Sequence, residues 1–342
     1  MSISNKRNIH NLNLPVLSAS QEKGMILRSE NGIDIKYDQN KINTYKIVNS
    51  GDYVVHLRSF QGGFAFSTID GICSPAYTIL KCNPEMIEYG FFEQFFTSKK
   101  FIDSLRIVTY GIRDGRSISV EEFLNLKGSF PNKDEQLKII KFYTLINKRI
   151  DTQNKIIEKY KSLIKVINQM MCNFDHEKIQ VQNVFDFKEK TKHQANMGNS
   201  QGNFIYFTNE ESTYKYFDSY DFDGEYIIAN TGGKANFKYY NGKFAVMSDC
   251  LVMECNDNQN TKFYLYSILN RIDYINQVCF VGSGLKHLDK KLFLKTFITK
   301  FNKNLEPFIN LIILLEKKIS NDKILLQKLK EQKKYLLSNM FI

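Results

Sequence analysis

The sequence lacks any long apolar run. A membrane-spanning helix needs about 18 consecutive apolar residues, and the longest candidate, residues 308–315, is interrupted by Asn310 and stops at Glu316. Lys6 and Arg7 near the N-terminus are not followed by the apolar segment of a secretory signal. We therefore expect neither a membrane protein nor an exported one, and we expect a cytoplasmic location.

Metal-binding and catalytic spacings are also missing. None of the six cysteines forms a C-x-x-C pair, and no two-Cys, two-His pattern appears, so we expect no structural zinc site. Several cysteines fall in apolar runs, which is typical of a reduced cytoplasmic chain. The five histidines are scattered, and no Ser-His-Asp or Cys-His arrangement can be assigned. The sequence therefore predicts no metal ligand and no catalytic residue.

Acidic residues are too few to balance the basic ones. Lysine and arginine number 47 against 36 aspartates and glutamates, which leaves a formal net charge of +11 over 342 residues. An excess of this size points to a polyanionic partner and says nothing about the fold. At about 150 residues per domain the length suggests two domains, and a hydrophobic fraction of 43% indicates a folded chain.

The chain contains an internal duplication. Residues 51–55 and 224–228 each start a segment that reads as a short strand, a glycine loop and a second strand. The number of residues from Gly51 to Gly224 equals the number from Cys82 to Cys255. Each copy continues with an apolar stretch at helical spacing. A second glycine loop with cations follows, at residues 111–116 and 282–287, and then a long helical stretch. Because the order of these features is the same, we expect two related modules.

The two long helical stretches each have a heptad seam. We expect the first helix to begin at Pro131, where a missing N–H costs nothing. Apolar residues then recur at steps of three and four with a few polar interruptions. Either each helix packs on its own domain, or the two helices pair with each other, and their matched lengths favour pairing. The expected seams are Ile139, Phe142, Ile146, Arg149, Gln153, Ile156, Tyr160, Leu163, Ile167 and Met170, and Phe308, Ile312, Leu315, Ile319, Asp322, Leu326, Leu329, Lys333, Leu336 and Met340.

These patterns predict an α+β fold. Two α/β domains stand in tandem, each followed by a long helix, and the two helices pair as an antiparallel coiled coil. The expected boundaries are 1–130 for the first domain, 131–175 for the first helix, 176–303 for the second domain and 304–342 for the second helix. A helix of ~35 residues spans ~50 Å, so such a pair separates two binding modules by more than one turn of B-form DNA.

Two short motifs invite an enzymatic interpretation, and neither is complete. Ser74-Pro75-Ala76-Tyr77 resembles the motif by which amino-methyltransferases hold a base, but alanine replaces its second proline and no glycine-rich cofactor loop precedes it. The start of a strand is the better interpretation. Residues 231–234 read Thr-Gly-Gly-Lys, yet the G-x-x-x-x-G-K-[ST] phosphate loop is absent.

The glycine loops are better candidates for binding. They combine flexible backbone with cations and amides, and Arg and Lys suit guanine edges or phosphates while Asn and Gln suit adenine. Any one of these side chains is more often a solvated loop residue, but their recurrence in both copies favours a DNA interface. The candidate DNA-binding residues are Arg58, Gln61, Arg113, Arg116, Asn230, Thr231, Lys234, Asn236, Lys238, Lys286 and His287.

The whole chain resembles the specificity (S) subunits of type I restriction-modification systems. The likeness lies in the strand at residues 51–55 with Ser74-Pro75-Ala76-Tyr77, in Pro131-Asn132-Lys133-Asp134-Glu135-Gln136 before the first helix, and in the helix endings at 167–171 and 337–341. The Pro-x-x-x-Glu-Gln start is the most specific of these features. The order of a target-recognition domain, a conserved helix, a second such domain and a second helix is also similar.

The resemblance implies a non-catalytic reader of double-stranded DNA. Each recognition domain would read half of a bipartite target, while the paired helices set the spacing and dock two methylation (M) subunits. Restriction (R) subunits would join that core. No cofactor is expected in this chain, since S-adenosylmethionine, ATP and Mg would be bound by the partner subunits.

Two departures from the family pattern keep alternatives open. Residues 184–192 lead into the second domain, whereas residues 1–8 offer little equivalent, and the second helix begins Asn304-Leu305-Glu306-Pro307. A partial or rearranged subunit that reads one half-site is therefore one alternative. A coiled-coil scaffold that binds proteins is the other.

Overall fold

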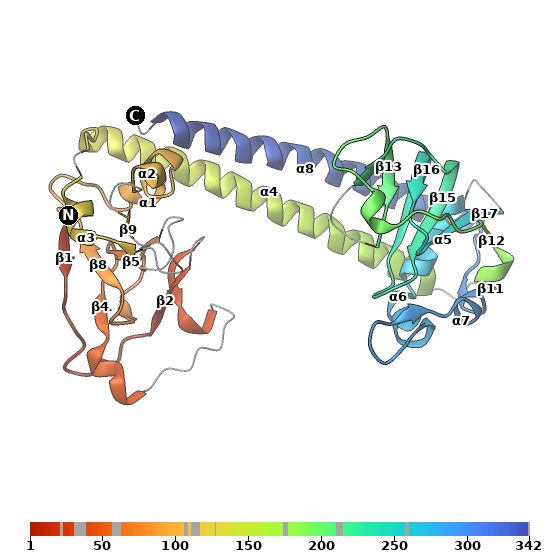
Figure 1. Ribbon diagram of the computed structural model, residues 1–342, viewed down its shortest axis with the longest axis horizontal. Helices are drawn as coiled ribbons and strands as arrows, with labels where there is room; N and C mark the ends of the chain where they lie inside the picture. The colour runs from red at the N-terminus through yellow and green to blue at the C-terminus, as the bar shows by residue number, and fades with distance from the viewer. Residues whose placement is uncertain are drawn as a thin grey trace. The chain divides into compact units, whose positions relative to one another are not determined.

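The computed structural model describes residues 1–20, 23–30, 39–56, 63–105, 109–110, 117–126, 128–173, 177–209, 215–256 and 260–340. The chain divides into two compact units, which we call unit 1 (residues 1–155 with 324–342) and unit 2 (residues 156–323). Each unit combines β-sheet with short helices and with part of both long helices (Figure 1). The predicted α+β class is confirmed.

Unit 1 is built on a four-stranded sheet with the order β1-β8-β5-β6. Its central strand β5 pairs antiparallel with both β6 and β8. All residues of β5 and β6 are buried, as expected for short β-branched and aromatic runs between turns. Three two-stranded ladders complete the unit: β2 with β3, β4 with β7, and β9 with β10. The strands are β1 (Ser2–Ser4), β2 (Leu17–Ser20), β3 (Gly24–Leu27), β4 (Lys46–Val48), β5 (Tyr53–Val55), β6 (Phe64–Phe66), β7 (Gly71–Cys73), β8 (Thr78–Lys81), β9 (Thr109–Tyr110) and β10 (Ser117–Ile118).

Short helices cover one face of this sheet with phenylalanine. The helices are α1 (Phe91–Phe95), α2 (Lys99–Ser104) and α3 (Val120–Leu124), and the 3₁₀ turns are η1 (Arg28–Glu30) and η2 (Gln39–Thr44). Phe92, Phe96 and Phe123 pack in one hydrophobic cluster with Tyr53 of β5. The Tyr53 hydroxyl accepts a hydrogen bond from the Phe92 N–H at 3.1 Å, which ties α1 to the sheet.

Unit 2 contains a larger sheet of six strands, in the order β12-β17-β15-β16-β13-β14. Side chains alternate between its two faces. Ile227 and Ala229 of β15 join the cluster beneath helix α5, whereas Tyr226 and Ile228 join the cluster on the opposite face. The strands are β12 (Phe185–Phe187), β13 (Phe204–Phe207), β14 (Lys215–Phe217), β15 (Phe222–Asn230), β16 (Phe237–Val246) and β17 (Cys250–Cys255).

Short elements flank the six-stranded sheet. Two ladders, β11 with β20 and β18 with β19, lie outside it. A π-helical turn, η7 (Ile275–Cys279), follows α6, and such turns are rare and often occur at functional sites. The remaining elements are β11 (Lys178–Gln180), η4 (Val181–Asn183), η5 (Ala195–Met197), α5 (Thr261–Leu269), α6 (Ile272–Tyr274), β18 (Phe280–Val281), β19 (His287–Leu288), α7 (Lys290–Leu294), β20 (Phe297–Thr299) and η8 (Lys303–Leu305).

The duplication seen in the sequence appears as a repeated strand order. The order β1-β8-β5-β6 in unit 1 matches β12-β17-β15-β16 in unit 2. In both units a small hairpin, β9–β10 or β18–β19, is followed by a short helix whose N-cap side chain, Ser119 or Asp289, accepts backbone hydrogen bonds. Because β1 pairs with β8 as β12 pairs with β17, the interpretation that residues 1–8 have little equivalent to 184–192 is wrong.

The first long helix, α4 (Lys133–Asn173), begins two residues later than predicted. Pro131 precedes the helix, and Asn132 caps it by accepting a hydrogen bond from the Glu135 N–H at 3.0 Å. Gln136 is buried, and its carboxamide accepts from the Glu88 N–H and donates to the carbonyls of Met86 and Pro131. The Pro-x-x-x-Glu-Gln motif therefore pins a turn of unit 1 to the start of α4.

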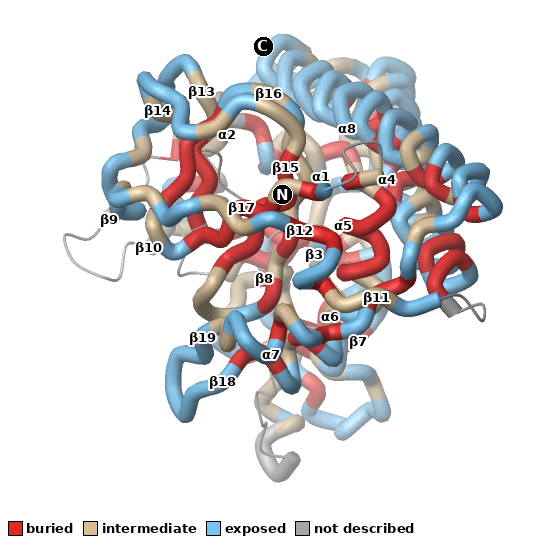
Figure 2. The backbone as a smooth tube through the Cα atoms, turned by 90° about the vertical axis from the view of Figure 1, so that its right-hand side faces the viewer, coloured by how far each residue is buried: buried red, intermediate tan, exposed pale blue. Residues whose placement is uncertain are grey.

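The seam of the second long helix, α8 (Glu306–Met340), is confirmed except at Met340, whose side chain lies outside the described part. In α4 the expected seam differs from the buried positions by one residue at several places. Adjacent apolar residues make the 3.6-residue period ambiguous there. Figure 2 colours the buried positions of the two helices red, among exposed positions in pale blue. In α4 the predicted Phe142, Arg149, Leu163 and Met170 are exposed, while Tyr143 and Met171 are buried and Ile150 and Ile164 are partly buried.

Both long helices contribute to the core of each unit. In unit 1, Tyr143 and Ile146 of α4 pack in the cluster that Leu336 and Leu337 of α8 also contact. In unit 2, the cluster contains Ile167 of α4 together with residues from the first turns of α8, such as Ile309 and Ile312. The N-terminal part of one helix thus shares a core with the C-terminal part of the other in both units.

Candidate nucleic-acid interface

The loop of residues 231–236 connects β15 to β16 and is held by Asn230. The Asn230 amide nitrogen donates to the carbonyls of Gly232 (2.8 Å) and Lys234 (2.5 Å), and its amide oxygen accepts from the Asn236 N–H at 2.7 Å. Gly233 has a φ of 84°, a conformation that favours glycine. With these bonds made inside the loop, Asn230 is buried and shapes the loop from within.

A second loop, between β18 and β19, lies directly beside the first. The Gly233 N–H donates to the Lys286 carbonyl at 2.9 Å, and the Leu288 N–H donates to the Thr231 carbonyl at 2.9 Å. Gly232 and His287 also form an isolated β-bridge. We call residues 231–236 and 282–287 together the two-loop surface. Two segments that are distant in the sequence, both predicted to bind DNA, are therefore brought together.

The two-loop surface carries exposed basic side chains. Lys234, Lys286 and His287 are all exposed. Asp289, the nearest carboxylate along the chain, uses one of its oxygens to cap α7 by accepting from the Lys291 and Leu292 N–H groups. Lys238 lies further along β16, partly buried, with its ammonium 6.0 Å from the centre of the Phe207 ring. The surface therefore presents cations on a backbone that its own hydrogen bonds order.

Further side chains support the two-loop surface from beneath. Asn276, on the π-helical turn η7, accepts a hydrogen bond from the Ala235 N–H at 2.7 Å. The Thr231 hydroxyl donates to the Asp249 carbonyl at 2.7 Å, so Thr231 also serves the loop itself. The sequence analysis missed Asn276, because no local signal marks a π-helical turn or the loop that it contacts.

Four predicted DNA-binding residues lie outside the described residues: Arg58, Gln61, Arg113 and Arg116. The strands that flank these four residues in the sequence are described, and they show which connections carry the residues. Residues 57–62 connect β5 to β6, and residues 111–116 connect β9 to β10. These are the connections in unit 1 that correspond to the two loops of unit 2. The candidate interface therefore rests on unit 2.

The motifs considered for catalysis have structural roles. Ser74 lies in a turn in which its hydroxyl accepts from the Ala76 N–H, and β8 begins at Thr78, as the strand interpretation expected. One histidine has a partner that the sequence did not suggest, since His193 Nε2 lies 2.9 Å from Asp221 Oδ1. Within the ranges given above, no three His, Cys, Asp or Glu side chains are grouped as a metal ion would require.

The cysteine thiols are buried or partly buried, and none forms a disulfide. Burial raises the pKa of the Cys73 and Cys250 thiols to about 12, because a thiolate would lose its hydration. Burial likewise raises the pKa of the Cys82 thiol to about 11. These groups therefore stay protonated at neutral pH.

The long helices carry apolar side chains that their own units leave exposed. On α4 these include Leu145 and Leu163, and on α8 Leu314 and Tyr335, each more than 40% exposed. Contiguous exposed apolar patches mark protein-protein contacts, and these side chains are candidates for such a contact. None of the described helices is both long enough and apolar enough to cross a membrane.

The fold is that of type I restriction-modification S subunits. One similar structure is the S subunit from M. genitalium, with a TM-score of 0.60 and 15% identity over 87% of this chain and 84% of that one. Another is a chain from a study of complex assembly and conformational transition in the type I R-M system. It has a TM-score of 0.59 and 12% identity over 99% of this chain and 94% of that one. No protein-family model and no curated protein matches the sequence.

Proposed function

We propose that this chain is the specificity subunit of a type I restriction-modification complex and that it binds DNA in a sequence-specific manner. The observation that carries the proposal is the fold, which follows an S subunit over 87% of this chain. The resemblance noted in the sequence, at Pro131 to Gln136 and in the strands, points to the same family independently. The location that this function requires is cytoplasmic.

Each unit reads one half of a bipartite target in double-stranded DNA. In unit 2 the two-loop surface is the contact, because its exposed cations suit phosphates and guanine edges and its backbone is ordered by Asn230 and Asn276. Lys234, Lys286 and His287 contact the DNA directly, while Asn230 and Thr231 hold the loop. The corresponding connections of unit 1 supply Arg58, Gln61, Arg113 and Arg116.

The chain itself is non-catalytic. Two methylation subunits bind S-adenosylmethionine and transfer the methyl group, and restriction subunits supply the ATP- and Mg-dependent reactions. The candidate site contains hydrogen-bonding amides and cations, which recognise a ligand but do not by themselves break a bond. The cofactors therefore belong to the partners.

The long helices pair as an antiparallel coiled coil and dock the methylation subunits. Shared cores support the pairing, since α4 and α8 contribute to one hydrophobic cluster in unit 1 and to another in unit 2. The exposed apolar residues of both helices, such as Leu145 and Leu314, are the docking contacts. Helix length then sets the distance between the two half-sites.

Selection of DNA by the assembled complex tests this function. The chain is co-purified with methylation subunits of a type I system, and bound DNA is recovered from a random duplex library and footprinted. We expect a motif of two short half-sites separated by unread base pairs. A Lys234→Gln, Lys286→Gln double variant should weaken binding to the unit 2 half-site, whereas Lys317→Gln with Lys328→Gln on α8 is the matched control.

A protein-binding scaffold is the second candidate, and the exposed apolar residues on α4 and α8 favour it. On that alternative the chain binds its partners normally but the complex recovers no DNA motif at any salt concentration. A single contiguous motif would instead support a subunit that reads one half-site. S-adenosylmethionine binding by the isolated chain would contradict the non-catalytic assignment.

A further inference from the structure

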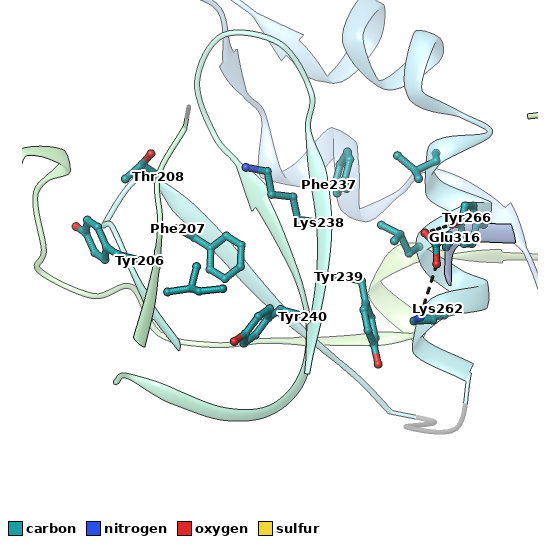
Figure 3. Close-up of a pocket in the computed structure, with 13 residues that line it drawn as sticks. Tyr206, Phe207, Thr208, Phe237, Lys238, Tyr239, Tyr240, Lys262, Tyr266 and Glu316 are labelled. Carbon is teal, nitrogen blue, oxygen red and sulfur yellow. Dashed lines mark hydrogen bonds and ion pairs between the residues drawn. The ribbon is translucent and has the colours of Figure 1, made fainter. Parts of the chain in front are cut away.

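A cavity of about 460 Å³ lies in unit 2 beside one edge of β16 (Figure 3). One edge of β16 pairs with β15 over eight residues. The other edge pairs with β13 only from Phe244 to Val246. In the part of the chain that the structure describes, no strand pairs with that edge between residues 237 and 243. Lys238, Tyr239 and Tyr240 of this stretch line the cavity.

Aromatic rings form the walls. Tyr239 and Tyr240 are neighbours on a strand, so their rings lie on opposite faces of the sheet, and Figure 3 shows them on either side of the strand. The Tyr240 ring packs against Phe207 at 5.4 Å. Burial, and then Glu225, raise the pKa of Tyr239 to about 12, so its phenol is neutral at physiological pH. The cavity thus offers uncharged, flat surfaces.

The charge within the cavity is positive. Lys238 and Lys262 line it, and the Lys262 ammonium lies 4.8 Å from the centre of the Tyr239 ring. The one carboxylate of the lining, Glu316, is already engaged. It accepts a hydrogen bond from the Tyr266 hydroxyl at 2.5 Å, and its other oxygen is 3.7 Å from the Lys262 ammonium. An anionic ligand would therefore be attracted.

The cavity is also next to the two-loop surface. Lys238 follows the loop of residues 231–236 by two positions. Thr208 lines the cavity, and its neighbour Asn209 has its amide nitrogen 3.8 Å from where a Cβ on Gly232 would be. A strand of nucleic acid held by the loops can therefore continue into the cavity.

We propose that this cavity binds one unstacked nucleotide, with its base against the Tyr240 ring and its phosphate at Lys238, which lies on the same face of the strand as Tyr240. The proposal rests on the proposed DNA-binding function and deepens it. The volume suits a small ligand. Stacking on aromatic rings accepts any base, because every base has a π-face, and nearby cations hold the backbone. The nucleotide comes either from a DNA strand, where it is extruded or unpaired, or from solution.

The corresponding cavity in unit 1 has a different character. Phe64 and Phe66 line it, and in the repeat these two residues correspond to Phe237 and Tyr239 of unit 2. The carboxylate of Glu93 also belongs to the lining. A second carboxylate, that of Asp151, lines it as well. Burial raises the pKa of the Glu93 carboxyl and lowers that of the Lys333 ammonium in the same cavity. Three lysines line it against two carboxylates, so its charge alone does not exclude a nucleotide. We assign the nucleotide to unit 2 because the two-loop surface lies next to that cavity.

Fluorescence of 2-aminopurine tests the proposal. The chain has no tryptophan, so the probe can be excited without tryptophan emission from this chain. Three probes are titrated with the full-length chain in complex with its methylation subunits: 2-aminopurine 5′-monophosphate, a single-stranded oligonucleotide and a duplex, each containing the base. We expect saturable quenching of the single-stranded probe, as stacking on tyrosine predicts. Quenching of the monophosphate as well would identify solution nucleotides as a further source.

Two substitutions in the cavity have matched controls. Tyr240→Leu keeps apolar contact with Phe207 but removes the flat ring, and Lys238→Gln removes the cation on the same face from a partly exposed position. Each should weaken binding of the single-stranded probe roughly tenfold. Tyr220 and Lys243 form a similar pair, with the ammonium 4.5 Å from the ring centre, outside the cavity. Tyr220→Leu and Lys243→Gln should leave binding unchanged.

The outcomes separate this inference from the proposed function. If wild-type complex selects a duplex motif but quenches neither the single-stranded probe nor the monophosphate, the cavity assignment is overturned and the DNA-binding function remains. Equal affinity of wild type and Lys238→Gln would also overturn it, because Lys238 is not part of the buried core. If the complex selects no motif, the proposed function fails, whatever the probes show.

Discussion

At the scale of single residues, the candidate interface separates side chains that can touch DNA from those that hold the loops. Lys234, Lys286 and His287 are exposed, while Asn230 uses its whole carboxamide on the backbone of its own loop. A residue type that suits base recognition is therefore not enough to assign a contact. Where the hydrogen-bonding groups of a side chain are satisfied within the protein, its substitution changes loop geometry first.

Lys234→Gln should weaken DNA binding and flatten its salt dependence. Each phosphate contact releases counterions, so losing one should reduce the slope of log K against log salt by about one. Fluorescence anisotropy with a duplex at several salt concentrations measures this. Lys328→Gln, an exposed lysine on α8, is the control. An unchanged slope for Lys234→Gln would remove this residue from the interface.

Asn276→Ala should reduce sequence discrimination more than overall affinity. The substitution leaves the Ala235 N–H without its acceptor, at a cost of about 1–3 kcal/mol to the ordered loop. Backbone contacts to phosphate tolerate such loosening, but base contacts do not. The ratio of Kd values for selected and scrambled duplexes is the measurement, and Asn276→Asp should restore it because a carboxylate also accepts. Asn310→Ala, at an exposed position, is the control. If the Kd ratio of Asn276→Ala equals that of wild type or of this control, Asn276 does not support the loop in base recognition.

At the scale of elements, the long helices show what a heptad pattern can and cannot specify. In α8 the described part of the expected seam coincides with buried or partly buried positions, although runs such as residues 311–315 also offer adjacent apolar residues. In α4, pairs such as Phe142-Tyr143 and Met170-Met171 offer two adjacent choices. Packing decides between them, since Tyr143 and Met171 are buried while Phe142 and Met170 are exposed.

Leu329→Ala should destabilise the chain, whereas Leu325→Ala should not. Leu329 is 6% exposed and Leu325, one turn earlier on α8, is 38% exposed. Truncating a buried leucine costs about 2–5 kcal/mol through lost transfer energy and the cavity left behind. Urea unfolding followed by circular dichroism compares the two. Equal midpoints for both variants would mean that the seam does not contribute to stability.

At the scale of the whole molecule, the duplication gives one chain two related modules, which is what the proposed two-part target requires. Both units have the same strand order and the same small hairpin before a capped helix, yet their loop residues differ. The net charge of +11 is spread over both units and both helices, and many lysines solvate the helices, such as Lys317 and Lys328. If the proposed function holds, DNA specificity depends on a minority of the basic residues.

The proposed helix pair predicts a simple relation between helix length and target spacing. Deleting seven residues from the middle of both α4 and α8 keeps the seam register and shortens each helix by about 10 Å. At about 3.4 Å per base pair, the gap between half-sites should fall by about three base pairs. The motif selected by the assembled complex gives the gap. An unchanged gap would contradict the proposal that the helices set it.

Sequence alone determined the class of the fold, the duplication and the α8 seam. These depend on local periodicity and on the spacing of glycines, which the chain carries irrespective of what packs against it. The repeat order was readable because strands, loops and helices recur at one constant offset, from Gly51 to Gly224 and from Cys82 to Cys255. The family resemblance also came from local motifs, and the fold agrees with it.

Only the tertiary structure decided which residues meet. The loops at 231–236 and 282–287 are bridged by hydrogen bonds between distant segments, Asn276 reaches Ala235 from a π-helical turn, and β1 takes an edge position on β8. Such contacts depend on long-range pairing, which no local pattern encodes. For the same reason, burial separated the side chains that shape the binding loop from those that extend out of it.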